Sequence, residues 1–225
     1  MRGSGDDLSI EYGIYEAAEA DAMVKVLADV FPRRDPLAVA AGITPSEFEP
    51  FVHALLPMAA EERLTIAARL GSSGELVGVM LTNDPARETA EGMETLSEKF
   101  GPVGSILGEL VTTYRAGREP HPGEMLHLYL LGVSDRVAGR GVGQRLVYAA
   151  VENGARRGYR VAVAEATNKV SQHIFLKLGF AARGQIAYRD FSFRGQNVFE
   201  SIAEHGGAIL MEKLLAPIPA VARSM

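Results

Sequence analysis

The feature that most constrains the fold is the order of three patterns between residues 126 and 158. Leu126-His-Leu-Tyr-Leu-Leu-Gly-Val133 is a short and almost continuously apolar run, which is typical of a strand buried in the middle of a sheet. Ser134 to Gly143 follows and is rich in glycine, and apolar residues then recur at helical spacing until Gly158. The order of strand, glycine loop and helix predicts an α/β fold.

Such a junction suits a polyphosphate for physical reasons. Glycines let an anion approach the backbone, and the unpaired N–H groups at a helix start point toward it along the helix dipole. Arg136, Arg140 and Arg145 add positive charge here. Glycine loops before helices also occur as plain tight turns, so this pattern alone leaves both interpretations open.

The first third of the chain predicts a strand, two helices and a hairpin. Residues 8–16 alternate as in a half-buried strand, and residues 17–30 have helical spacing that we expect Pro32 to end. Thr44-Pro-Ser-Glu47 has the cap, proline and acid of a second helix start, and this helix continues to Leu56. Strands are expected at residues 64–70 and 75–81, around Gly71-Ser-Ser-Gly74.

Residues 84–123 are expected to form a helical insertion between the third and fourth strands. Residues 86–100 and 106–116 have helical patterns, which Gly101-Pro102 and Pro120-His-Pro-Gly123 interrupt. A packed surface hairpin and a substrate lid both fit this segment, and no site is assigned to it.

The last third predicts a strand at residues 160–166, a helix from Ser171 to Leu178 after Asn168, and a turn at Gly179-Phe180. A tail is expected at residues 216–225, after the last strand. Residues 1–7 are expected to be a flexible N-terminus.

Composition narrows the class of protein. A chain of 225 residues with 47% hydrophobic content favours one domain over residues 1–225. The chain has no cysteine, no signal-peptide core and no apolar run of about 18 residues, which predicts a cytoplasmic protein without a membrane partner. A net charge of −5 argues against a nucleic-acid partner. His53, His121 and His173 lack metal-ligand spacing, so we expect no metal.

Two spaced motifs resemble the GNAT superfamily of N-acyltransferases. That family has Gln/Arg-x-x-Gly-x-Gly/Ala in its cofactor loop, and later Asn-x-x-Ala/Ser followed by Lys-Leu-Gly-Phe. This chain has Ala138-Gly-Arg-Gly-Val-Gly143, Asn168-Lys-Val-Ser171 and Lys177-Leu-Gly-Phe180. The resemblance implies the GNAT fold, with a mixed and mostly antiparallel central sheet flanked by helices, and implies acyl-CoA as co-substrate.

The resemblance further implies that backbone N–H groups of the loop hold the pyrophosphate and that the strand edge at residues 131–133 pairs with the pantetheine arm. Gly132 would ease a bulge there. The implied cofactor-binding residues are Leu131, Gly132, Val133, Ala138, Gly139, Arg140, Gly141, Val142, Gly143, Gln144, Asn168, Ser171 and Phe175.

Two positions depart from the family pattern. Ala138 stands where Gln or Arg is usual, so Arg136 or Arg140 is left to contact the phosphates. Phe175 stands where many members place a tyrosine that protonates the leaving thiolate, and phenylalanine has no proton to donate. Either Tyr188, Ser171, water or bulk solvent serves as the acid, or no specific acid is needed because the thiolate leaves readily.

Further segments resemble the arylalkylamine N-acetyltransferase branch. Phe31-Pro-Arg-Arg-Asp-Pro-Leu37 places Asp35 where that branch has its catalytic glutamate, and residues 205–213 resemble its closing strand. His127-Leu-Tyr129 is similar to a His-Leu-His stretch of vertebrate serotonin acetyltransferases, with His127 at the first histidine.

His127 is the first candidate for the base, because imidazole accepts a proton near neutral pH and an alkylammonium must lose one before it attacks a thioester. Asp35 is the rival, and Glu124 is a weaker third candidate. A plain hydrogen bond within a buried strand also explains His127, and a turn before Pro36 also explains Asp35.

The sequence therefore predicts an N-acyltransferase that moves an acetyl or other acyl group from acyl-CoA to a primary amine, by direct attack in a ternary complex. A small amine is preferred to a peptide or protein amine. A non-catalytic acyl-CoA sensor is the alternative from another class, and a carrier-protein donor and a homodimer stay open.

Overall fold

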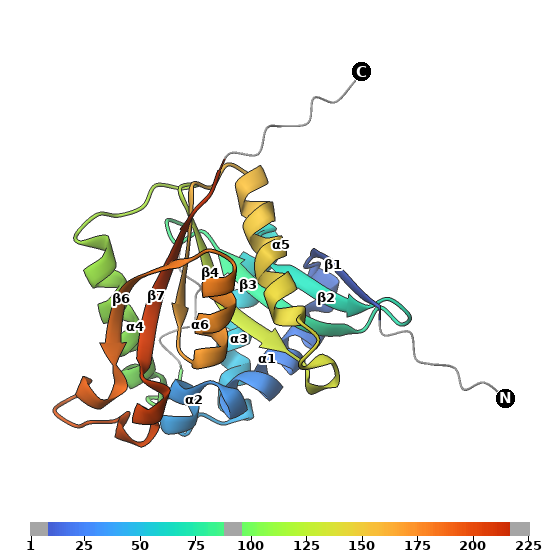
Figure 1. The fold of residues 1–225 in the computed structure, drawn as a ribbon. Coiled ribbons are helices and arrows are strands. Elements are labelled where there is room, and N and C mark those ends of the chain that lie inside the picture. The colour runs from blue at the N-terminus through green and yellow to red at the C-terminus, as the bar shows by residue number, and fades with distance from the viewer. Residues whose placement is uncertain (1–8, 88–95, 217–225) are drawn as a thin grey trace.

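A mostly antiparallel sheet organises the described part of the chain, residues 9–87 and 96–216 of a computed structural model, as Figure 1 shows. Its strand order is β1-β2-β3-β4-β5-β7-β6, and only β4 and β5 pair in parallel. The strands are β1 (Ile10–Ile14), β2 (Ile66–Leu70), β3 (Leu76–Asn83), β4 (Met125–Val133), β5 (Val161–Ala166), β6 (Ala181–Ala187) and β7 (Gly207–Leu214). The predicted GNAT-type sheet is confirmed, with the apolar run at its centre.

Helices cover both faces of the sheet. They are α1 (Ala20–Arg34), α2 (Pro36–Ala40), α3 (Pro45–Glu62), α4 (Phe100–Arg115), α5 (Val142–Arg156) and α6 (Lys169–Lys177), with short 3-10 turns η1 (Ala17–Glu19), η3 (Asp135–Val137), η4 (Tyr188–Asp190) and η5 (Glu200–His205). One core cluster joins α5 and α6 to the sheet, and a second joins α1 and α3 to the opposite face. A third places α4 against β6 and β7.

A bulge at Tyr129 divides β4 into two halves. Its register against β3 shifts between the pairs Leu130–Leu81 and Leu128–Thr82, so Tyr129 is the extra residue. The extra residue turns the following side chains to the other face. Leu128 therefore packs in the α5 core, whereas Leu130 packs in the α1 core.

The expected bulge at Gly132 is wrong, because Gly132 pairs in regular register with Val79. Its missing side chain has a different purpose. A Cβ atom at Gly132 would lie 2.7 Å from Cδ2 of Leu27. Glycine therefore lets α1 pack directly on β4.

Two helix boundaries differ from the sequence prediction. Helix α1 continues through Pro32 to Arg34, because the missing N–H costs one hydrogen bond in the last turns while the proline ring is buried. Gly101 and Pro102 lie in the first turn of α4, where a proline needs no amide partner.

The helix predicted for residues 86–100 is wrong in its described parts, because residues 86–87 and 96–99 are not helical. Residues 88–95 lie outside the described residues. The predictions for residues 1–7 and 217–225 also lie outside them.

Asp84 joins the two ends of the helical insertion between β3 and β4. Its buried carboxylate accepts hydrogen bonds from the N–H of Gly123 at 2.7 Å and from the hydroxyl of Tyr159 at 3.1 Å. Its own N–H donates to Glu62 at 2.8 Å. The insertion therefore starts and returns at one hydrogen-bonded point beside β4.

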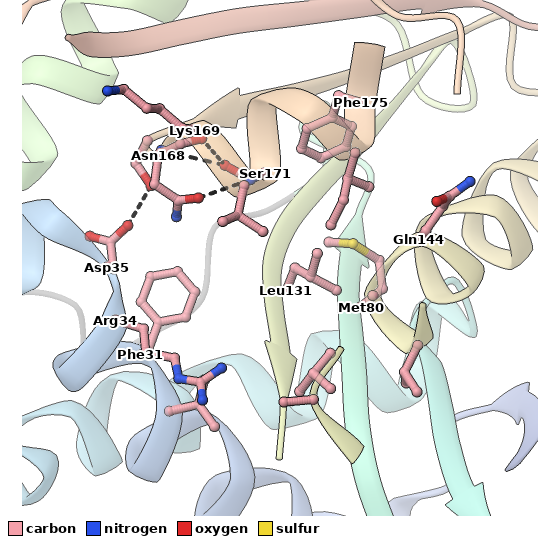
Figure 2. Close-up of a pocket in the computed structure, with 18 of the residues that line it drawn as sticks. Phe31, Arg34, Asp35, Met80, Leu131, Gln144, Asn168, Lys169, Ser171 and Phe175 are labelled. Carbon is pink, nitrogen blue, oxygen red and sulfur yellow. Dashed lines mark hydrogen bonds between the residues drawn. The ribbon is translucent and has the colours of Figure 1, made fainter. Parts of the chain in front are cut away.

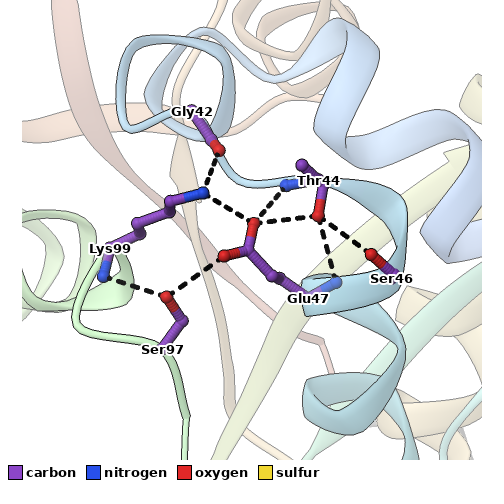
Figure 3. A network of polar contacts seen from close by, with 6 residues as sticks. All are labelled: Gly42, Thr44, Ser46, Glu47, Ser97 and Lys99. Atoms are coloured by element: carbon purple, nitrogen blue, oxygen red, sulfur yellow. Dashed lines mark hydrogen bonds and ion pairs between the residues drawn. The ribbon is translucent and has the colours of Figure 1, made fainter.

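A second polar network connects the residues just before α4 to the start of α3, as Figure 3 shows. The predicted cap at Thr44 is confirmed as a capping box with Glu47. The same carboxylate accepts a hydrogen bond from Lys99 Nζ at 2.9 Å, and Lys99 also donates to the carbonyl of Gly42. The hydrogen bonds from Lys99 and from Thr44 lower the pKa of Glu47 to about 2.

We expect Glu47→Gln to lower the thermal unfolding midpoint at pH 7 and to lose most of that effect at pH 3. The folded pKa of Glu47 is about 2 against an ordinary 4.5, so its contribution is complete above 4.5 and is lost as pH falls toward 2. Melting curves at both pH values measure this. Glu49→Gln, an exposed carboxylate on the same helix, is the control, and an equal difference at both pH values would contradict the prediction.

Candidate functional site

A cavity opens where β4 and β5 separate. Their parallel pairing ends at His127 and Val163, while β4 continues to Val133 along β3. Beyond His127, β4 thus has one edge without a strand neighbour in the described sheet. A cavity of about 780 Å³ lies there, between α1, the loop after β4, α5, the end of β5 and α6.

Figure 2 shows two opposite ends of this cavity. Gln144, at the start of α5, lies on one side, and Asp35 and Arg34, at the end of α1, lie on the other. Leu131 of β4 lies between them. We name the first the loop end, formed by residues 138, 139 and 141–144, and the second the acidic end, formed by Asp35, Glu165, Thr167, Glu204 and His205.

The loop end exposes the start of α5. Gly139 and Gly141 both adopt a φ of +75°, which a side chain strains. Gly141 is the N-cap residue, no side chain caps the helix, and the first intrahelical bond runs from Arg145 N–H to Gly141 O. The N–H groups of residues 142–144 therefore precede the helical ladder and can bind an anion.

Most of the predicted cofactor residues line this cavity. Gly132 and Arg140 are not among the lining residues. Those that line it are Leu131, Val133, Ala138, Gly139, Gly141, Val142, Gly143, Gln144, Asn168, Ser171 and Phe175.

Arg136 and Arg140, the two arginines expected to contact the phosphates because residue 138 is alanine, have different surroundings. Arg136 binds Glu75 at 2.5 Å, which directs its guanidinium to the hairpin between β2 and β3. Arg140 is exposed, and no hydrogen bond or ion pair of its side chain is found within the described residues. The positive charge of Arg140 is therefore available to contact a phosphate group.

Asn168 and Ser171 form a capping box at the start of α6. The Asn168 side chain accepts the Ser171 N–H at 2.8 Å, and the Ser171 hydroxyl donates to the Asn168 carbonyl at 2.9 Å. Phe175 follows one turn later, buried edge-on against Phe180. Helix α6 is thus fixed against the cavity wall by its own cap and by this aromatic pair.

Asp35 is a buried carboxylate at the junction of α1 and α2. One oxygen accepts the Ala38 N–H at 3.0 Å and caps α2, and the other accepts a short hydrogen bond from the Thr167 hydroxyl. Burial raises the pKa of Asp35, although these hydrogen bonds and the charge of His205 oppose the rise. Asp35 therefore has a structural task besides its place in the cavity lining.

Tyr188 lies behind this carboxylate. Its side chain is fully buried, and its hydroxyl donates to the Thr167 carbonyl at 2.5 Å. Burial, and then the charge of Asp35, raise the pKa of Tyr188. Tyr188 does not line the cavity.

His127 also lies outside the cavity lining, behind Glu165. Its Nε2 atom is 2.7 Å from Oε2 of Glu165, and Glu165 does line the cavity. Burial alone would raise the pKa of Glu165, but the charge and hydrogen bond of His127 hold it below its ordinary value. The buried pair therefore presents a carboxylate to the acidic end. Glu124, the third candidate, binds the His121 N–H and Arg118 away from this lining.

Sequence reasoning missed Glu165, Thr167 and His205. A usable signal was present, because a strand puts alternate residues on one face, and Glu165 and Thr167 are the polar pair at the end of an otherwise apolar β5. His205 had no local signal, since only the folded chain packs η5 against α2 and brings His205 near Asp35.

Among the described residues, no helix is both long and apolar enough to cross a membrane. Among those same residues no three acidic or histidine side chains are grouped as a metal site requires. The arrangement can hold a polyphosphate at one end and a cation at the other.

Comparison with a family model gives a match over residues 44–180, described as the acetyltransferase (GNAT) family. The matched residues extend from the cap of α3 to Phe180 and include the loop end of the cavity.

Solved structures share the fold. The C-terminal condensation domain of Ebony, in complex with beta-alanyl-dopamine, has a TM-score of 0.84 at 12% identity. Arylalkylamine N-acetyltransferase 2 from Aedes aegypti has 0.78 at 21%, and the Drosophila melanogaster polyamine N-acetyltransferase has 0.74 at 22%. Each match covers 92% of this chain and 100% of the other. At these identities the likeness establishes the shared fold.

We expect Asp35→Ala to lower the free energy of unfolding by about 2 kcal/mol, because it removes an N-cap and leaves the Thr167 hydroxyl without its acceptor. Asp35→Asn keeps a capping oxygen and should cost about 1 kcal/mol or less. Urea denaturation of both variants measures the difference. An Asp35→Ala variant as stable as the wild type would show that these contacts do not support the fold.

Proposed function

The chain belongs to the acetyltransferase (GNAT) family, and on this premise we propose that it moves an acetyl group from acetyl-CoA to the primary amine of a small molecule. The observation that carries the proposal is the single cavity with an anion-binding helix start at one end and carboxylates at the other. The two ends match the charges of a coenzyme A pyrophosphate and of an ammonium group.

The loop end fits coenzyme A. The N–H groups of residues 142–144 and the bare backbone at Gly139 and Gly141 suit a pyrophosphate. The β4 edge at residues 131–133 has hydrogen-bonding groups for the amide-rich pantetheine arm. Bound there, acetyl-CoA supplies an activated acyl group as a thioester.

The acidic end fits an amine. Asp35, Glu165 and Glu204 line it, and Phe31 and Tyr129 add aromatic surface beside them. An alkylammonium gains charge-assisted hydrogen bonds from carboxylates, and aromatic faces attract cations. The similar folds include enzymes named for arylalkylamines and for polyamines, which supports a small amine over a peptide.

The chemistry is direct transfer. The ammonium nitrogen loses one proton and forms a C–N bond to the acyl carbon. The C–S bond then breaks, and the second proton that the nitrogen gives up neutralises the departing thiolate. Holding both reactants in one cavity supplies the orientation, and backbone N–H groups near Val133 stabilise the charge on the acyl oxygen. The chain has no cysteine, and the Ser171 hydroxyl is engaged in the α6 cap, so no covalent enzyme intermediate is invoked.

We expect free coenzyme A to be released from acetyl-CoA only when a suitable amine is present. A thiol reagent measures this without interference, because the protein has no thiol. The panel contains arylalkylamines, polyamines, amino acids and peptides. Tight acetyl-CoA binding without release for any amine would favour the acyl-CoA sensor instead.

We expect Gly143→Phe to weaken acetyl-CoA binding at least about tenfold. A Cβ at Gly143 would point toward Ile174, Leu131 and Val133 at ordinary contact distances of 3.5–3.7 Å, and these three residues line the cavity. A phenyl ring would therefore occupy the space proposed for the coenzyme.

Gly143→Ala is the matched control, because a methyl group fits at these distances and alanine favours a helix. Calorimetric titration with acetyl-CoA measures both affinities. Unchanged affinity in Gly143→Phe would mean that the coenzyme binds elsewhere.

A further inference from the structure

We propose that Glu165 takes the proton from the acceptor amine and relays it to His127. This inference rests on the proposed transfer to an amine and assigns the step that frees the attacking nitrogen. Neither the sequence motifs nor the family resemblance points to Glu165.

The strand register puts the two side chains together. His127 of β4 lies opposite Val163 of β5, at the last parallel pair before the strands separate. Glu165 lies two residues further along β5 on the same face, so its side chain reaches the point where the cavity opens. The 2.7 Å contact between His127 Nε2 and Glu165 Oε2 crosses this separation point.

Glu165 lies between His127 and the cavity. Glu165 is one of the lining residues and His127 is not. The side chains of Glu165 and His127 are only 7% and 15% exposed, so the contact between them is shielded from bulk water. An amine bound in the cavity can therefore pass a proton to His127 through the Glu165 carboxylate.

The groups around Glu165 and His127 favour the anionic form of Glu165, which can bind an ammonium group. Tyr129 packs against the His127 ring at 5.0 Å between centroids, and the Glu165 charge adds to burial in raising the pKa of Tyr129 to about 12. Tyr129 thus stays neutral. The positive charge of Arg115 on α4 acts on Glu165 from the other side. The Tyr114 hydroxyl donates a hydrogen bond to the Glu212 carboxylate at 2.6 Å.

The proton balance is simple. Before transfer the Glu165 carboxylate is an anion and Nε2 of His127 carries no proton. The amine N–H bond breaks as an O–H bond forms on Glu165, and that same proton then moves to Nε2, from which it makes the 2.7 Å hydrogen bond back to the carboxylate. The carboxylate is again an anion, the imidazole is a cation, and the amine has its lone pair for attack. No oxidant, reductant or further reactant is needed.

A second cavity of about 40 Å³ lies beyond the pair. His127, Glu165, Tyr114 and Arg115 all line it. The buried Nε of Arg115 has no hydrogen-bond partner within the described part of the chain. Apolar side chains, among them Val111, Met125, Val163 and Leu210, form most of the remaining wall of this cavity.

Asp35 suits the relay less well. Both of its oxygens accept structural hydrogen bonds, one from the Ala38 N–H and one from the Thr167 hydroxyl. Its hydrogen-bonded neighbours are a hydroxyl and a backbone amide, neither of which accepts a proton readily at neutral pH. The imidazole of His205 acts on Asp35 through its charge, but no hydrogen bond or ion pair joins the two side chains among the described residues. Glu165 instead contacts an imidazole, which does.

The test is steady-state kinetics of Glu165→Gln, His127→Gln and the double variant with an amine that the wild type acetylates. We expect each single change to lower kcat by about 100-fold with little change in the amine KM, because general base catalysis contributes about that much. The double variant should lose little more than either single variant, because the two residues act as one unit.

A pH profile separates the relay from simple binding. The activity of Glu165→Gln should rise with pH as free amine replaces ammonium, since bulk water then does the work of the relay. Glu212→Gln on the neighbouring strand β7 is the matched control. It removes a partly buried carboxylate that does not line the cavity, and its kinetics should match the wild type.

Each outcome decides the inference. Activity of Glu165→Gln within about threefold of wild type, a raised amine KM with unchanged kcat, or additive losses in the double variant would overturn the relay but leave the acetyltransferase intact. Acetyl-CoA titration and melting curves confirm that the variants are folded. A wild type that releases no coenzyme A with any amine would overturn the proposed function and the relay together.

Discussion

The position of the candidate site depends on the separation of β4 from β5. Parallel pairing holds these strands together only as far as His127 and Val163, after which β4 follows β3 and β5 turns toward α6. The opening between them leaves backbone groups of β4 available on one edge and separates α5 from α1 across a cavity of about 780 Å³. This opening is surrounded by the start of α5, by carboxylates and by aromatic side chains, which together form the candidate binding site.

The end of β5 ties several distant segments to the opening. Glu165 reaches back to His127 on β4, and the Thr167 hydroxyl reaches Asp35 at the end of α1. The Thr167 carbonyl accepts the hydroxyl of Tyr188, which follows β6. One short stretch of strand thus fixes side chains from three parts of the chain. Thr167 also explains why Asp35 and Tyr188, both expected as catalytic groups, lie so near each other.

Local patterns were enough for the elements that carry their own signals. Thr44 formed the predicted helix cap, as a capping box with Glu47, and the apolar run became the central strand. Errors arose where packing outweighed local preference. Pro32 stayed in α1 because its ring is buried, and Gly132 serves a close contact with Leu27 instead of a bulge.

By itself the sequence determined the order of elements, the family and the residues of the glycine loop, because periodicity, caps and motifs act over short distances along the chain. Only the tertiary structure decided that Glu165 stands between His127 and the cavity and that His205 approaches Asp35. Such neighbours are set by strand register and by helix packing. These depend on contacts between residues far apart in the chain, which no local pattern records.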